Sequence, residues 1–338
     1  MRVVGREAGE RFNFLTLRAF YLGLALAWVA GAAAAAEGTI RVGSLRYGTL
    51  SWQLDVIANH GLDKKEGLRI EPLELAGAPA AQLALHAGRV DLIVSDWLWV
   101  SRQRAEGGDL TFIPFSSAIG GVIVPAASPI RDVAGLAGQR LGIAGSALDK
   151  SWLVLRLFAR ARLGLDLEAL ADKSFGAPPL LSEALIAGRL DAVLTYWPFA
   201  AKLEARGMRR LLSIGDALAA LGVPADLPLT GYVVSSRWAS DNQTPLEVFV
   251  GATRRANAIL AASDAEWERI APLTGAADPA ELVKLRDAYR DGIPRRWDAA
   301  EREAAARLYR LLAEIGGAAL VGPSLELASG TFLDSVRY

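Results

Sequence analysis

The chain has 338 residues, 52% of them hydrophobic and 22% charged, which is the balance of a folded globular protein with room for two domains. Its 37 basic and 37 acidic side chains cancel, without a basic patch or an acidic tail, so we expect no nucleic-acid partner. The absence of cysteine excludes disulfides, thiolate metal sites and cysteine nucleophiles.

The first 36 residues have the pattern of a secretory signal peptide. Arginines precede a short apolar run over residues 19–30, and small residues follow as far as Ala36. The apolar run is shorter than a comfortable membrane span, and no cysteine follows it that could carry a lipid. We therefore expect cleavage near Ala36 and export to the periplasm, with an uncleaved membrane anchor as the alternative.

Strand and helix patterns alternate through the first two thirds of the chain, and helical patterns fill the rest. The predicted strands are residues 40–45, 68–75, 90–94, 110–115, 120–126, 139–143, 190–194 and 229–235. The predicted helices are residues 51–59, 79–87, 101–105, 151–163, 199–206, 245–262, 265–273, 279–290 and 299–315. Such alternation predicts an α/β protein with parallel strands.

One stretch of sequence occurs twice, at an offset of one hundred residues. AGRVDLIVSDW at 87–97 returns as AGRLDAVLTYW at 187–197. Each copy has a glycine that ends a helix, then a buried parallel strand, then polar and aromatic residues at the strand's carboxyl end. Ligands of open α/β sheets bind at that edge, so the repeat predicts two lobes that share one cleft. A chance match between two ordinary αβ units is the alternative.

The candidate ligand-binding residues lie where predicted strands end. In the first lobe they are Tyr47, Gly48, Thr49, Ser95, Asp96, Trp97, Ser116 and Ser117. In the second lobe they are Gly145, Ser146, Ala147, Ser151, Thr195, Tyr196 and Trp197. The free amides of the helix starts favour an anionic group, and the two tryptophans are placed to sandwich a ligand. For each residue, a role in helix capping or in the core is the alternative, and Asp149 and Lys150 are interpreted as a solvated first turn.

No metal site, cofactor or catalytic activity is expected. His60 and His86 lie far apart in helical stretches without a carboxylate cluster. The chain has no nucleophile-elbow, zinc-protease or phosphate-loop motif.

The chain is expected to pass twice between the lobes, near residues 122–126 and 232–235. Lobe 1 would then comprise residues 37–123 and 235–338, and lobe 2 residues 124–234. Two crossings make a hinge, and a hinge between α/β lobes makes a closing cleft.

Four segments together resemble the periplasmic substrate-binding proteins of ABC importers, in particular the aliphatic sulfonate, taurine and nitrate group, which shares its fold with binders of thiamine precursors. The segments are IRVGSLRYGTL at 40–50 and the stretches at 127–146, 188–207 and 233–256. The resemblance implies a type II-like binding protein with two Rossmann-like lobes joined by a two-strand hinge. Such a protein is a monomer that captures a small organic molecule and delivers it to an ABC transporter permease.

The chain departs from the sulfonate group at both repeat strand ends. Asp96-Trp97-Leu98-Trp99 stands where that group has a Gly- and Pro-rich turn, and Trp197 stands where it often has an acidic residue. A carboxylate and several indoles disfavour a small bare oxyanion and favour a ligand with a ring, a cation or a donor group. The ligand is thus left open among sulfonates, nitrate, pyrimidines and aromatic compounds.

Two other functions are alternatives to the importer role. A periplasmic sensor or accessory protein would need the same ligand-binding fold. A pyrimidine-synthase-like enzyme also shares the fold, but the export signal and the lack of a cysteine cluster argue against it.

Overall fold

The computed structural model describes Met1 and residues 38–46 and 48–335 of the chain. The rest of the predicted signal peptide and the candidate residue Tyr47 lie outside the described residues.

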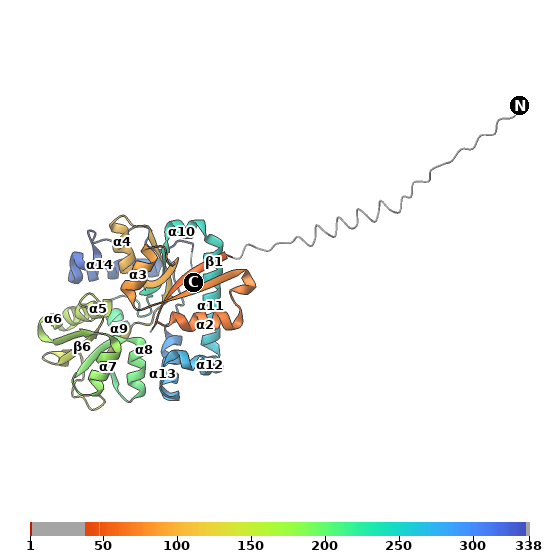
Figure 1. The fold of residues 1–338 in the computed structure, drawn as a ribbon. Coiled ribbons are helices and arrows are strands. Elements are labelled where there is room, and N and C mark those ends of the chain that lie inside the picture. Colours follow the sequence, from red (N-terminus) through yellow and green to blue (C-terminus); the bar gives the residue numbers. More distant parts are fainter. Residues whose placement is uncertain (2–37, 47, 336–338) are drawn as a thin grey trace.

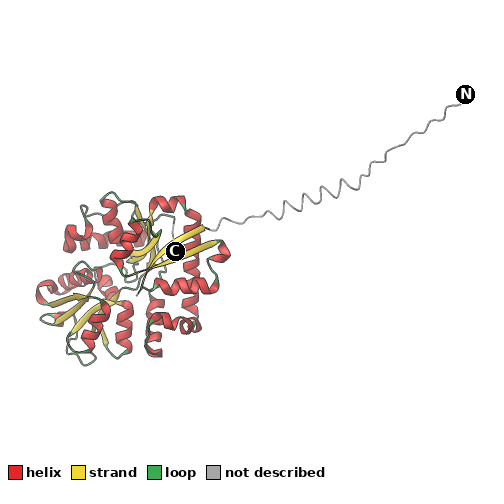
Figure 2. Cartoon of the chain, in the orientation of Figure 1, coloured by secondary structure: helices red, strands yellow, loops and turns green. Residues whose placement is uncertain are grey.

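Two five-stranded sheets form the framework of the protein. The first sheet has the order β2-β1-β3-β10-β4, with β1 (Gly38–Leu45), β2 (Leu68–Leu75), β3 (Leu92–Asp96), β4 (Leu110–Ser116) and β10 (Thr230–Ser235). The second has the order β7-β6-β8-β5-β9, with β5 (Gly120–Val124), β6 (Arg140–Ala144), β7 (Asp172–Gly176), β8 (Ala192–Tyr196) and β9 (Arg209–Ser213). The sheets lie in separate halves of the molecule, each with strands inside and helices outside (Figure 2).

The two sheets share one arrangement of strands. In the first, β1 runs parallel to β2 and β3, and β10 runs antiparallel to β3 and β4. In the second, β6 runs parallel to β7 and β8, and β5 runs antiparallel to β8 and β9. The predicted two-lobe α/β fold is confirmed.

The crossings between the sheets differ from the predicted ones. β5 pairs on both sides within the second sheet and β10 on both sides within the first, so neither strand runs from one half into the other. The chain passes over at residues 117–119, and it returns through residues 221–229, between α9 and β10. A buried strand needs hydrogen-bond partners along both edges, and each of these strands finds both partners in one sheet.

The helices that follow the strands cover the sheets (Figure 1). Those of the first half are α2 (Leu50–His60), the 3₁₀ turn Lys64–Glu66, α3 (Ala78–His86) and α4 (Trp97–Ala105). Those of the second are the 3₁₀ turn Val133–Leu136, α5 (Lys150–Phe158), the π turn Ala159–Leu163, α6 (Leu167–Leu170), α7 (Pro178–Ile186), α8 (Trp197–Ala205) and α9 (Ile214–Ala220). The C-terminal helices are α10 (Ser236–Asp241), α11 (Gln243–Ala262), α12 (Asp264–Thr274), α13 (Pro279–Asp291) and α14 (Ala299–Val321). In the part of the chain that the structure describes, none of the helices has the length and hydrophobicity that a membrane crossing requires.

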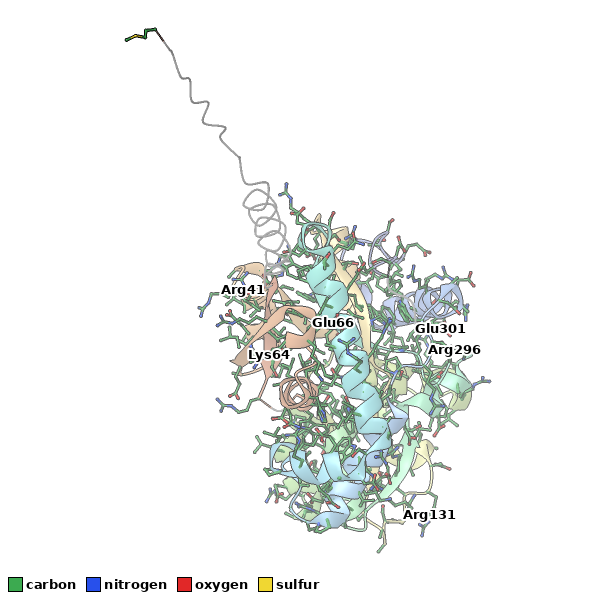
Figure 3. The ribbon with its side chains drawn as sticks, turned by 90° about the vertical axis from the view of Figure 1, so that its right-hand side faces the viewer. Arg41, Lys64, Glu66, Arg131, Arg296 and Glu301 are labelled. Atoms are coloured by element: carbon green, nitrogen blue, oxygen red, sulfur yellow. The ribbon has the colours of Figure 1, made fainter. Side chains whose placement is uncertain are left out.

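The repeated Gly-Arg-x-Asp sequence makes the same contact in each half. Asp91 accepts hydrogen bonds from the backbone nitrogen of Arg41 at 2.8 Å and from its Nε at 3.0 Å. Asp191 accepts the equivalent two bonds from Arg140, each at 2.9 Å. The aspartate therefore joins the start of each repeat strand to the strand beside it, and Arg41 lies on the first half in Figure 3.

The C-terminal helices α11 and α12 pack on α2 of the first half, and α13 packs on α12 and on α8 of the second half. Glu66 lies beside α11 (Figure 3), 3.5 Å from the guanidinium of Arg255. Inside, Gln53 of α2 donates to Asn257 of α11 at 2.6 Å, and Tyr289 of α13 donates to the same Asn257 oxygen at 2.7 Å.

The last helix, α14, reaches both halves because it packs against α4 and also against α5. Its start is fixed by a capping box, in which Asp298 accepts from the Ala300 nitrogen at 2.8 Å and Glu301 accepts from the Asp298 nitrogen at 3.0 Å. Arg296 lies 3.7 Å from Glu301 at this end of the helix (Figure 3).

Candidate functional site

The carboxyl end of the first repeat strand faces the start of a helix in the other half. β3 of the first sheet ends at Asp96, and Lys150 begins α5 in the second half. The Lys150 Nζ lies 3.8 Å from the Asp96 Oδ2, and both side chains are mostly buried, with 19% and 28% of their surface exposed. This ion pair joins the end of β3 to the start of α5, at the kind of strand edge where open α/β sheets bind ligands.

Asp96 has two contacts because helix α4 begins directly after β3. Its Oδ1 accepts a hydrogen bond from the Trp99 nitrogen at 2.9 Å and caps the helix. Its Oδ2 is then directed to Lys150 of the other half.

Tyr196 ends the second repeat strand and lies against Asp149, the residue that caps α5. The Tyr196 hydroxyl donates to Asp149 Oδ2 at 3.2 Å, while Asp149 Oδ1 accepts from the Ser151 nitrogen at 2.8 Å. Gly145 makes this approach possible. Its φ is 95°, and a Cβ there would lie 2.8 Å from the Tyr196 Oη and 3.0 Å from Asp149 Oδ2.

The electrostatics of this polar cluster, which we define as Asp96, Asp149, Lys150 and Tyr196, favour a positive or donor group. Burial, followed by the charge of Asp149, raises the pKa of Tyr196, so its hydroxyl stays protonated at neutral pH. The cluster holds two carboxylates and one ammonium group, so negative charge is in excess.

The helix starts at this edge differ in how they are capped. Asp96 and Asp149 occupy the starts of α4 and α5, where an anionic ligand would otherwise bind. The start of α2 has no side-chain cap and no acidic residue in its first turn. There Ser51 Oγ donates to the Gly48 carbonyl at 2.8 Å, and Thr49 is buried.

The remaining candidates of the second half lie close to the polar cluster. Gly145, Ser146 and Ala147 are exposed in the turn before α5, where Ser146 Oγ accepts from the Leu148 nitrogen at 3.3 Å. Ser151 is buried in the first turn of α5, and Thr195 is buried one residue before Tyr196. Among the described residues, Thr195 Oγ1 has no hydrogen-bond partner.

The other candidates of the first half lie in the sheet or at the crossing. Ser95 pairs with Gly231 inside the first sheet. Ser116 Oγ accepts from the Ala118 nitrogen at 3.1 Å, and the Ser117 nitrogen donates to the Gly292 carbonyl at 2.9 Å. The first crossing is thereby attached to the end of α13.

The two tryptophans do not face each other, so the predicted sandwich is wrong. Trp97 is completely buried, and its Nε1 donates to the Pro228 carbonyl at 3.0 Å. It packs near Tyr309, with ring centroids 6.5 Å apart, whereas Trp197 packs edge-on against Trp52 at 5.9 Å. As the first residue of α4, Trp97 points into the core beside α14 and has no surface left for a ligand.

Asp149 and Lys150, interpreted as a solvated turn, are the residues that the sequence reasoning missed. Their position in the sequence could have identified them. They lie at the start of the helix that follows Gly145, at the same edge of the sheet as the other candidate residues. Two surface cavities, one lined by residues of α7 and α8 and the other by residues of α10, α11 and the C-terminal segment, contain none of the predicted residues. In the described residues, no cluster of three His, Asp or Glu side chains is placed to hold a metal ion.

Two α/β lobes whose ligand-binding edges face each other define the fold of two-lobe periplasmic binding proteins. The chain belongs to the family described as NMT1/THI5 like, whose model matches residues 56–266. A comparison with curated protein sequences gives no match.

Solved structures with the same fold include two sulfonate-binding proteins. The alkanesulfonate-binding protein SsuA of Xanthomonas axonopodis pv. citri, bound to MOPS, is 21% identical with a TM-score of 0.67, over 89% of this chain and 99% of that one. The periplasmic aliphatic sulphonate binding protein SsuA of Escherichia coli is 20% identical with a TM-score of 0.68, over 86% and 95%. The desulfurization enzyme DSZB is 16% identical with a TM-score of 0.56, over 87% and 97%. Since binding proteins and an enzyme share the fold, function must be argued from the site.

Proposed function

We propose that this chain is an exported solute-binding protein that captures a small organic molecule between its lobes and delivers it to the membrane permease of an ABC transporter. The observation that carries the proposal is the Asp96–Lys150 contact of 3.8 Å, which joins the end of β3 in one lobe to the helix start after β6 in the other, at the edge where α/β proteins bind ligands. The periplasmic binding proteins of the same fold support it. The protein would act as a monomer in the periplasm, without a cofactor and without chemistry of its own.

The strand pairing supports a small change in the proposed lobe boundaries. The predicted limits at residues 123 and 234 fall inside β5 and β10. We place the limits at the crossings, residues 117–119 and 221–229, because β5 and β10 each pair within one sheet only. Lobe 1 then holds the first sheet with α10 to α13, and lobe 2 holds the second sheet.

The polar cluster supports a ligand with a cationic or hydrogen-bond donor group. Asp96 and Asp149 cap two helix starts, so these amides are not free for an oxyanion. Lys150 already neutralises one carboxylate, and a ligand ammonium group would compensate the other. Sulfonates, for which the two SsuA proteins are named, would meet an excess of negative charge at this edge.

The test is a thermal-shift screen of the mature chain with probes matched in their carbon frame. The pairs are ethylamine with ethanesulfonate and benzylamine with benzenesulfonate, followed by aminopyrimidines and aromatic acids. We expect the amine of a pair to raise Tm, its sulfonate to leave Tm unchanged, and the stabilising compound to be recovered intact after long incubation. Stabilisation by the sulfonates alone would contradict the proposed cationic or donor ligand. Consumption of a stabilising compound would indicate that the protein is an enzyme.

The export proposal has its own test. The protein is expressed with its natural leader, and the intact mass of the periplasmic fraction is measured. We expect a chain that begins near Glu37, while a chain retained in the cytosol or membrane with its leader intact would contradict export.

A further inference from the structure

Helix α8 of the second lobe lies along α13 of the first (Figure 1). Both helices meet the first crossing at one end. The Trp197 nitrogen at the start of α8 donates to the Ile119 carbonyl at 3.2 Å, and the Gly292 carbonyl at the end of α13 accepts from the Ser117 nitrogen at 2.9 Å. The two helices are therefore held together where the lobes are connected.

At the other end of α8, two cations reach across to the first lobe. Lys202 Nζ donates to the Gly275 carbonyl at 2.6 Å and to the Thr274 carbonyl at 3.2 Å, at the end of α12. A helix C-terminus carries partial negative charge, which favours an ammonium group there. Arg206 Nε donates to Glu281 Oε1 at 2.8 Å.

Glu281 is a strong partner for this contact because it is fixed and buried. Its side chain is 2% exposed, and its Oε2 accepts from the Ala277 nitrogen at 2.9 Å. Without Arg206, the buried carboxylate would lose its charged partner, which is costly.

We propose that Lys202 and Arg206, with their partners on α12 and α13, form a latch that holds the lobes closed before any ligand binds. Along α8, at about 1.5 Å of rise per residue, Arg206 lies about 13 Å from the crossing and Lys202 about 8 Å. A lobe rotation of about 20° about the crossing would move Arg206 by roughly 5 Å and Lys202 by roughly 3 Å, enough to lengthen both contacts beyond hydrogen-bond reach. Opening about the crossing therefore breaks both charged contacts.

The latch sets the balance between open and closed molecules. A ligand that binds the closed form binds more tightly when a larger fraction of the molecules is already closed. The latch, by increasing that fraction, raises the apparent affinity of the ligand. Residues about a helix length from the polar cluster would then tune affinity without touching the ligand. The inference rests on the proposed lobe division, but it needs no ligand to be tested.

The absence of native cysteine allows a direct distance measurement. Leu83→Cys on α3 and Leu180→Cys on α7 place one spin label on each lobe, at side chains that are 70% and 71% exposed. The test variants are Arg206→Gln and Lys202→Gln. The matched control is Arg210→Gln, whose 2.7 Å pair with Glu204 stays inside the second lobe.

We expect one short distance between the two spin labels, both in the doubly labelled parent and in the Arg210→Gln control. Each latch variant should add a longer distance, with the ratio of open to closed molecules raised about tenfold for one lost charged contact. Distance distributions in both latch variants that equal the control would overturn the latch. If Arg206→Gln does not fold, Lys202→Gln decides alone, because its partners are backbone carbonyls that water can satisfy. A ligand screen without hits would contradict the proposed function and leave this measurement unaffected.

Discussion

Gly145→Ala is the substitution whose effect can be worked out most fully from the structure. An alanine there must adopt a φ of 95°, which costs about 1–2 kcal/mol for a residue with a side chain. Its Cβ would also lie 2.8 Å from the Tyr196 Oη, so the hydrogen bond to Asp149 must lengthen or break, at about 1.5 kcal/mol more. The total of about 3 kcal/mol corresponds to a fall in Tm of roughly 4–5 °C for a protein of this size.

Gly164→Ala is the matched control for the backbone cost. Gly164 also has a positive φ, 67°, but a Cβ there would meet no atom within 4 Å. Calorimetry should show a fall in Tm of only about 2 °C for this variant. In a Tyr196→Phe background, the penalty of Gly145→Ala should fall but stay above that of the control, because the hydroxyl is gone while the Cβ still lies 3.0 Å from Asp149 Oδ2. Equal falls in Tm for both glycine variants would refute the close contact at Gly145.

Three further substitutions test the fold. Arg140 hydrogen-bonds Asp191 and so lowers the pKa of that carboxyl from 3.8; the stabilisation is therefore present above about pH 4 and is lost as the pH falls further. The Tm difference between the parent and Asp191→Asn should accordingly shrink below pH 4, and a constant difference would contradict this. Asn257→Ala leaves the buried amide of Gln53 without its acceptor and should cost about 2–4 kcal/mol in urea unfolding, whereas a loss below 1 kcal/mol would argue against the network. Trp97→Ala should cost about 3–5 kcal/mol because it empties a fully buried site, and a near-neutral effect would mean that Trp97 is not in the core.

Much of the fold could be predicted because the signals are local. Short apolar runs in the sequence coincide with β1, β2, β4 and β6. The repeat identifies β3 and β8 as equivalent strands. β7 and β9 were missed because they carry few buried apolar residues. In β7, whose sequence is DKSFG, no residue is buried. Its hydrophobic residues therefore do not alternate in the way that identifies a strand.

The candidate site could be predicted only in part, because its contacts join distant segments. The end of a strand locates Asp96 and Tyr196, but the pairing of Asp96 with Lys150 depends on how the two lobes face each other. The direction of the Trp97 indole depends on the fit of α4 against α14, which residue spacing does not encode. Capping by Asp149 was visible as a local pattern, but only the structure shows that its second oxygen accepts from Tyr196.

The order in which the strands of the first sheet occur along the chain has a consequence for how the protein is synthesised and folds. β4 joins its sheet through β10, which is synthesised more than one hundred residues later. A nascent chain that has not reached residue 230 therefore has an incomplete first lobe, with the edges of β3 and β4 unsatisfied. Such late, long-range pairing delays the stable native state until most of the polypeptide has emerged. The export that we propose requires an unfolded chain in the secretion channel, and this late pairing favours that state.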